Sequence, residues 1–149
     1  TAVQLDPADP AVAPEALRAV AEADWIFLGP GSWFTSVIPH LLVPALRQAL
    51  VTAPGRLVVV MNLAEQAGET GGFAPADHLA VLAEHAPDLP VHTVLVDAGC
   101  PVEDLADLEY VAKAAGARVV VDDVREADGS ARHDPVKLAA SYARIIATG

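Results

Sequence analysis

A run of glycine, hydroxyl and aromatic residues from Gly29 to Pro39 contains side chains suited to binding an anion. It reads GPGSWFTSVIP and lies between a short apolar segment and a long one. Glycines let a backbone turn tightly and approach a ligand. The helix expected to follow would direct backbone N–H groups and its positive dipole end at an anion. Thr35 and Ser36 would cap this helix or donate hydroxyls to a phosphate.

The glycine run alone does not distinguish a phosphate site from an ordinary strand-to-helix turn. No lysine follows Gly31, as it would in a P-loop, and the third glycine of a dinucleotide fingerprint is absent. Short glycine motifs also match often by chance. The run therefore predicts an anion site only together with other loops.

A second candidate is the eleven-residue loop from Asn62 to Gly72. It follows a continuous apolar segment and carries amide, carboxylate and hydroxyl groups among three glycines. Loops of this length in compact domains are usually functional or disordered. A solvated, flexible loop would have the same composition, but the position after a buried strand favours ligand contact.

A third candidate is the pair Arg132 and His133, just before the last expected helix. A guanidinium binds phosphate in two-point fashion, and an imidazole donates hydrogen bonds or transfers protons. A surface arginine beside a local cap partner is the alternative interpretation. The other histidines lack metal-ligand spacing, and Cys100 has no basic neighbour to activate it. We therefore predict no metal site and no cysteine nucleophile.

Strand-like and helix-like segments alternate around these loops. The run from Leu57 to Met61 is apolar throughout, which is typical of a strand buried on both faces. The alternation predicts an α/β, three-layer, Rossmann-like fold with a mainly parallel sheet. In such folds, ligands bind beyond the carboxyl ends of the strands. We expect strands at 3–5, 25–28, 57–61, 91–96 and 117–121, and helices at 14–23, 37–50, 75–85, 102–115 and after 134.

Two of the expected helices carry further detail. The helix from Val37 to Leu50 would contain Pro44 as a possible kink, and the last helix would be capped by Asp134 with Pro135 in its first position. On the first of these helices, the residues expected to be buried are Val37, Leu41, Ala45 and Leu46.

Composition limits the classes of partner. The chain has 149 residues, 53% of them hydrophobic, and a formal net charge of −11. Such acidity argues against nucleic-acid binding and docking on anionic membranes, which need basic surfaces. No apolar run approaches the roughly 20 residues of a membrane span, so we expect no membrane insertion. One phosphorylated ligand remains compatible, because backbone N–H groups can bind it.

Three ordered blocks together resemble the YvcK family of gluconeogenesis factors, called CuvA in mycobacteria. Residues 29–44 resemble its GPGS-aromatic-TS-x-x-P-x-LL-V segment. Residues 62–73 resemble its N-x-x-x-Q-x-GET-x-G-aromatic block, and residues 132–139 its RHD-x-x-K-x-A block. The resemblance extends over nearly the whole chain. The wider superfamily includes CofD, the 2-phospho-L-lactate transferase of coenzyme F420 synthesis.

The resemblance implies a cytoplasmic protein that binds UDP-sugars such as UDP-N-acetylglucosamine. It also implies a homodimer, and roles in gluconeogenic growth, cell shape and cell-wall precursor supply. The family associates a late tyrosine and arginine with this ligand, which we assign to Tyr110 and Arg132, although a helical tyrosine most often packs. The expected binding residues are Gly29, Gly31, Ser32, Thr35, Ser36, Asn62, Gln66, Gly68, Glu69, Thr70, Tyr110, Arg132 and His133.

Two departures from the family pattern affect these expectations. The family begins with a glycine-rich strand–turn–helix that is absent here, and this chain opens on a strand-like segment. We therefore expect residues 1–149 to be the C-terminal portion of a single CofD/YvcK-like domain, truncated at its N-terminus. Residues 97–100 read DAGC where the family usually has asparagines before a glycine.

Three functions remain open from the sequence. The first is a non-catalytic UDP-sugar-binding regulator, favoured because no catalytic pair or metal cluster is evident. The second is a CofD-type phosphotransferase using a nucleotide-diphosphate donor, with Glu69 and His133 as acid/base groups and Mg²⁺ as a possible cofactor. The third is an interaction module whose loops bind no small molecule.

Overall fold

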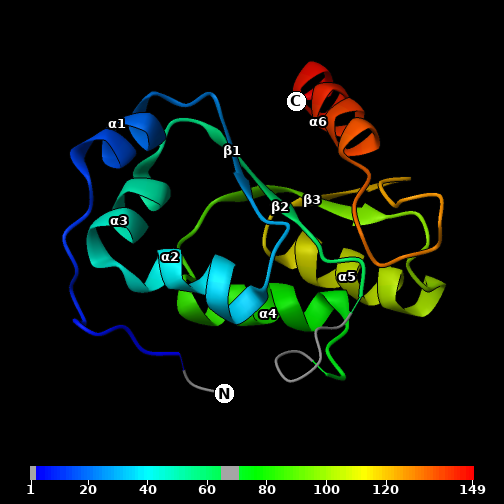
Figure 1. Cartoon of the computed structure of the whole chain (residues 1–149), viewed down its shortest axis with the longest axis horizontal. Helices are drawn as coiled ribbons and strands as arrows, with labels where there is room; N and C mark the ends of the chain where they lie inside the picture. Colours follow the sequence, from blue (N-terminus) through cyan, green and yellow to red (C-terminus); the bar gives the residue numbers. More distant parts are fainter. Residues whose placement is uncertain (1–2, 65–70) are drawn as a thin grey trace.

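The computed structural model describes residues 3–64 and 71–149. Its centre is a parallel sheet with the order β1-β2-β3-β4 (Figure 1). This sheet confirms the predicted α/β class and parallel pairing. The strands are β1 (Trp25–Leu28), β2 (Arg56–Val60), β3 (Val91–Asp97) and β4 (Arg118–Asp122).

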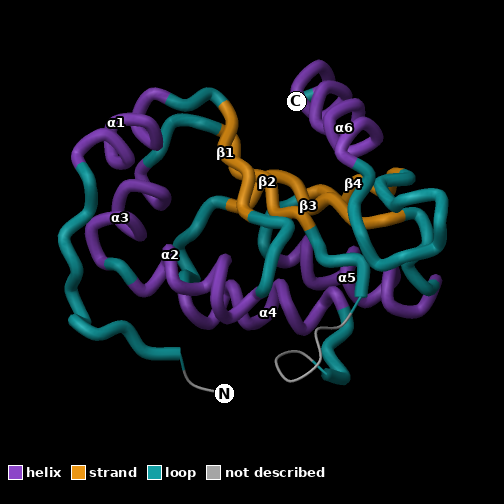
Figure 2. The backbone as a smooth tube through the Cα atoms, in the orientation of Figure 1, coloured by secondary structure: helices purple, strands orange, loops and turns teal. Residues whose placement is uncertain are grey.

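The helices cover both faces of this sheet (Figure 2). Helices α2, α4 and α5 lie on one face, whereas α6 follows β4 and returns to the opposite face (Figure 1). Right-handed crossovers between strands that follow one another in the sheet place their helices on one side. The helices are α1 (Pro14–Glu22), α2 (Ile38–Leu42), α3 (Pro44–Thr52), α4 (Pro75–His85), α5 (Val102–Ala114) and α6 (Pro135–Thr148).

Residues of β2 alternate between two hydrophobic clusters. Leu57 and Val59 join the larger cluster, which includes residues of α2, α4 and α5. Val58 and Val60 join a smaller one with Ile145 of α6. Every residue of β2 after its first is buried, as the continuous apolar run predicted. The sheet therefore forms the middle of three layers.

The predicted helix from Val37 to Leu50 is wrong in its continuity. A π-helical turn, η1 (Trp33–Val37), leads into α2, and α3 starts afresh at Pro44. Val43 has ψ of 110°, because the proline ring that follows disfavours helical backbone there. The segments before and after this break make an angle of 84°.

The break changes which side chains are buried. Val37 and Leu41 are buried as predicted, whereas Ala45 is exposed and Leu46 only half-buried. Ile38 and Leu50 occupy the core instead. The periodicity of one continuous helix could not predict these buried positions, because the direction in which each side chain points is set anew where α3 begins.

The predicted strand at residues 3–5 is also wrong. These residues form no strand, although Val3 packs against the larger cluster. An apolar residue can thus bury its side chain without its backbone joining the sheet.

In the described part of the chain, no single helix is long and apolar enough to cross a membrane. Among the residues that the structure describes, one bent pair of helical segments, from Trp33 to Thr52, reaches that length and composition together.

Candidate functional site

The glycine turn after β1 lies against the end of β2. Gly29 has φ of +84°, and a Cβ atom there would come within 2.8 Å of the Val60 carbonyl oxygen. Both features favour glycine, because other residues rarely adopt this backbone conformation and none could avoid the contact without a shift. The sequence prediction of a tight turn at this position is confirmed.

Asn62, directly beyond β2, holds this turn with both polar atoms of its side chain. Its Oδ1 atom accepts a hydrogen bond from the Gly31 backbone N–H at 3.1 Å, and its Nδ2 atom donates to the Gly31 carbonyl oxygen at 2.9 Å. These paired bonds join two loops that are 31 residues apart. Asn62 is therefore a positioning residue for the turn.

The hydroxyl residues after the glycines form the first turn of η1. The Ser32 Oγ atom accepts a hydrogen bond from the Thr35 backbone N–H at 3.3 Å and another from the Thr35 hydroxyl. Thr35 and Ser36 are exposed, whereas Trp33 and Phe34 are buried beneath them. π-Helical turns occur frequently at functional sites. Here the buried aromatic residues anchor a turn whose hydroxyls lie at the surface.

His133 reaches the same place from the far end of the chain. Residues 125–133 fold back on themselves, with Arg125 and His133 forming an antiparallel bridge. His133 shares a cavity of about 290 Å³ with Gly31 and Asn62. Burial lowers the pKa of His133 below its usual value, so the imidazole is neutral near pH 7. The site therefore combines the glycine turn with an uncharged imidazole.

Of the predicted binding residues that the structure describes, Gly31, Asn62 and His133 line this cavity. The other six do not: Gly29, Ser32, Thr35, Ser36, Tyr110 and Arg132. Arg132 is exposed, and its guanidinium contacts the Asp128 carboxylate at 3.2 Å and the Ser130 hydroxyl at 3.3 Å. Tyr110 is 79% exposed on α5. Neither residue lines the cavity that contains Gly31, and their assignments stay predictions. Gln66, Gly68, Glu69 and Thr70 lie outside the described residues.

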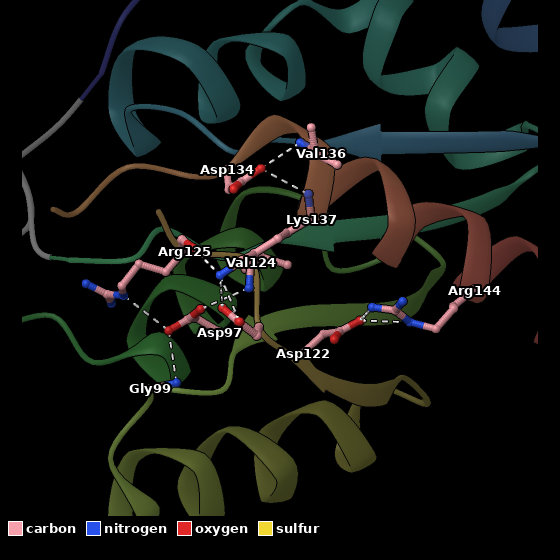
Figure 3. A network of polar contacts seen from close by, with 10 residues as sticks. Asp97, Gly99, Asp122, Val124, Arg125, Asp134, Val136, Lys137 and Arg144 are labelled. Atoms are coloured by element: carbon pink, nitrogen blue, oxygen red, sulfur yellow. Dashed lines mark hydrogen bonds and ion pairs between the residues drawn. The ribbon is translucent and has the colours of Figure 1, made fainter. Parts of the chain in front are cut away.

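Sequence reasoning missed an ion pair between buried Asp97 and half-buried Arg125 at the ends of the other strands. The carboxylate of Asp97, only 6% exposed, accepts hydrogen bonds from the backbone N–H groups of Gly99 and Val124 at 2.9 and 3.2 Å. It also accepts one from Arg125 Nε at 3.3 Å (Figure 3). Arg125 in turn donates to the Leu63 carbonyl oxygen at 2.9 Å. The pair thus connects the segments that follow β2, β3 and β4.

Sequence signals for this pair existed but were weak. Asp97 is an acidic residue at the end of an apolar segment, and Arg125 is a cation within an acidic connection. Their pairing depends on the order of β3 and β4 in the sheet. The described residues contain no group of three or more histidine, cysteine, aspartate or glutamate side chains that could hold a metal ion.

Two further ion pairs fasten α6 to the end of β4. Lys137 Nζ lies 2.8 Å from the Asp123 carboxylate and also donates to the Arg125 carbonyl oxygen at 2.9 Å. Arg144 pairs with Asp122 (Figure 3). The first pair raises the pKa of Lys137 and lowers that of Asp123. The helix behind His133 is thereby tied to the sheet.

Comparison with known proteins places the chain in a family. The family model described as 2-phospho-L-lactate transferase CofD matches residues 1–137. A relative from Mycobacterium tuberculosis (strain ATCC 25618 / H37Rv) is 46% identical over 140 residues, which cover 93% of this chain and 41% of the relative. A protein of Bacillus subtilis (strain 168) named gluconeogenesis factor is 35% identical over 127 residues, covering 85% of this chain and 37% of that protein.

A solved structure supports the same relationship. Protein BH3568 of Bacillus halodurans, described as a member of the UPF0052 family, superposes with a TM-score of 0.78 at 32% identity. The match covers 91% of this chain and 48% of that one. The chain spans about two fifths of the length of the first curated relatives. By the family model, the relatives and the fold together, this chain belongs to the CofD family and is similar to its gluconeogenesis-factor (YvcK-like) members.

Proposed function

We propose that the chain binds a UDP-sugar of the UDP-N-acetylglucosamine type and acts as a non-catalytic, cytoplasmic regulator. The processes it would serve are gluconeogenic growth, cell shape and cell-wall precursor supply. Relatives named gluconeogenesis factor support this reading. In this proposal the diphosphate lies on the glycine turn, and the whole protein works as a homodimer.

One observation carries the proposal, namely the paired hydrogen bonds between Asn62 and Gly31 beside the His133 cavity. They hold the turn in one conformation before any ligand arrives, which lowers the ordering cost of binding. The N–H groups of Gly31 and Thr35 are already bonded to Asn62 and Ser32, so in this proposal other backbone N–H groups of the turn and the exposed hydroxyls of Thr35 and Ser36 bind the phosphate oxygens. Such groups can bind an anion even in a chain whose net charge is −11. A preorganised backbone site suits an acidic protein that binds a single anionic ligand.

Calorimetry with UDP-N-acetylglucosamine tests this proposal in the intact protein. We expect Asn62→Ala to weaken binding about tenfold or more, because two hydrogen bonds that order the turn are lost. Gln48→Ala removes an exposed amide on α3 and is the matched control. Failure of the unaltered protein to bind any UDP-sugar would overturn the proposal.

Arg132→Ala tests the arginine assignment separately. Weaker binding in this variant would support phosphate contact by Arg132 once the ligand is present. Equal affinity of the variant and the unaltered protein would remove that role from Arg132. The proposal for the glycine turn would then depend on the Asn62→Ala result alone. Tyr110→Ala gives the same test for the exposed tyrosine.

A second candidate function is phosphoryl transfer from a nucleotide-diphosphate donor. The description of the matching family model favours it, as does the neutral imidazole of His133 beside Gly31, which can accept a proton. The test supplies lactyl-diphosphoguanosine, the deazaflavin acceptor and Mg²⁺. Turnover that disappears in His133→Gln would establish this reading over the first. Absence of product with a binding-competent protein would reject it.

A further inference from the structure

A second cavity adjoins the glycine-turn site. It has a volume of about 300 Å³ and shares Asn62, Leu63 and Ala64 with the His133 cavity. Small-molecule sites measure about 300–1,000 Å³, and each of these cavities lies at the lower end of that range. Each could therefore hold one portion of a ligand that extends across both. The chemistry of this second cavity is set by Phe73, His78, Asp97, Cys100, Asp104 and Arg125.

The charges in this second cavity disfavour another anionic group. Its wall carries the carboxylates of Asp97 and Asp104 against the single guanidinium of Arg125. Arg125 already donates to Asp97 and to a backbone carbonyl. The pKa of the Cys100 thiol is raised by burial and by the carboxylates of Asp104, Asp97 and Glu103, which agrees with a negative local potential. A neutral group rich in hydrogen-bond donors suits this environment.

His78 adds a buried acceptor to the same wall. The residue is 5% exposed, and its Nδ1 atom lies 3.0 Å from the Ala74 carbonyl oxygen. A carbonyl oxygen can only accept, so Nδ1 carries a proton, and in the neutral imidazole Nε2 is then an acceptor. Among the residues that the structure describes, Nε2 is buried and has no hydrogen-bond partner. A buried acceptor without a partner is costly, and a ligand donor would satisfy it.

Aromatic rings hold this imidazole in place and supply an apolar wall. The ring of Phe73 lies edge-on to His78 with centroids 5.5 Å apart, and Trp33 does so at 5.0 Å. Phe73 also lines the cavity. A pyranose ring has both hydroxyl donors and C–H groups, and thus matches a cavity with carboxylate acceptors and an aromatic edge.

We propose that this second cavity binds the glycosyl group of the nucleotide sugar whose diphosphate lies on the glycine turn. Asp104 and His78 accept hydrogen bonds from the sugar hydroxyl groups. Asn62, Leu63 and Ala64 form the wall between the sugar and the diphosphate. This inference rests on the proposed function and assigns the part of the site that selects the sugar.

The test compares UDP with UDP-N-acetylglucosamine by calorimetry on the intact protein. The measured quantity is the ratio of their dissociation constants, which reports the contribution of the sugar. Asp104→Ala should reduce this ratio about tenfold and leave UDP affinity unchanged, because a hydrogen bond to a charged acceptor is lost. Asp107→Ala, an exposed carboxylate on the same helix that does not line the cavity, should change neither value.

Each outcome separates this inference from the proposed function. Tighter binding of UDP-N-acetylglucosamine than UDP, lost in Asp104→Ala, supports the glycosyl site. Equal affinity for the two ligands overturns the glycosyl site and leaves nucleotide binding intact. The same conclusion follows if Asp104→Ala changes the affinities for UDP and for UDP-N-acetylglucosamine equally. Failure of both ligands to bind overturns the proposed function and this inference with it. His78→Phe, which keeps an aromatic ring but removes the acceptor, should reproduce the effect of Asp104→Ala.

Discussion

At the residue scale, Gly29 makes the glycine turn possible through two separable properties. Its φ is +84°, and its missing Cβ leaves room for the Val60 carbonyl oxygen. Gly129 has φ of +78°, but a Cβ atom there would meet none of the described residues within 4 Å, so this position isolates the backbone contribution. Comparing alanine at the two positions therefore separates conformational cost from steric cost.

We expect Gly29→Ala to lower the free energy of unfolding by about 2 kcal/mol or more, and Gly129→Ala by about 1 kcal/mol. The larger value contains the clash with Val60 in addition to the unfavourable φ. Urea unfolding of both variants measures the difference. Equal losses would mean that β2 shifts to accommodate the new methyl group at little cost.

His133 gives a pH dependence with a defined sign. Burial lowers its pKa in the folded protein below the unfolded value of 6.5. At pH values below about 6.5 the unfolded chain therefore binds more protons than the folded one, and stability falls as pH falls. Above pH 6.5 this contribution is fully present.

Unfolding free energies between pH 8 and pH 5 check this sign. The unaltered protein should lose more stability on acidification than His133→Gln. His40→Gln changes an exposed histidine and should follow the unaltered protein. Identical pH profiles for His133→Gln and the unaltered protein would contradict the burial of a neutral imidazole.

Residue types in the glycine turn could be predicted, but their contacts could not. Gly31 and Asn62 each stood out because glycine and amide residues follow apolar segments. Their mutual hydrogen bonds depend on β1 and β2 being neighbours in the sheet, which local pattern does not specify. The pairing of Asp97 with Arg125 could not be predicted for the same reason. Tertiary pairing between strand ends decides which polar residues meet.

At the element scale, helix starts were well predicted and helix continuity was not. Proline in the first turn marks the start of α4 and α6, because its fixed φ suits that position. Pro44 has the same role in α3, but the apolar pattern continues across it and hides the break. The proline is thus more informative than hydrophobic periodicity at this bend.

The contribution of the N-cap residue Asp134 to the stability of α6 can be tested. Asp134 Oδ1 accepts hydrogen bonds from the backbone N–H groups of Val136 and Lys137 at 2.8 and 3.1 Å. Asp134→Ala should lower the free energy of unfolding by about 1 kcal/mol, since these donors lose their partner. Urea unfolding measures the change. Asp134→Ser keeps a capping oxygen and should retain most of the stability, and an equal loss in both variants would contradict the capping role.

At the scale of the whole molecule, the partly buried ion pair of Asp97 and Arg125 connects loops from three strands. Asp97 binds backbone groups after β3 and β4, and Arg125 reaches the backbone after β2. The segment after β2 also holds the glycine turn through Asn62. A chain of polar contacts therefore extends across the carboxyl edge of the whole sheet.

Asp97→Ala should be the most destabilising change at this edge, at about 3 kcal/mol. It leaves Arg125 without its carboxylate, and it leaves the Gly99 and Val124 N–H groups without their acceptor. Arg125→Met should cost less, because Asp97 keeps both backbone donors and Arg125 is already 30% exposed. Urea unfolding of each variant gives these values.

The double variant Asp97→Ala/Arg125→Met decides whether the two residues act as a unit. Removing both charges eliminates the unpaired guanidinium, so the combined loss should be smaller than the sum of the single losses. Strict additivity would mean that the ion pair contributes nothing beyond the backbone contacts of Asp97. In that case the four strand ends would be held independently, and the glycine turn would be insensitive to changes near β4. Coupling would instead predict that Asp97→Ala also weakens the proposed ligand binding at the glycine turn, through the Leu63 and Asn62 backbone.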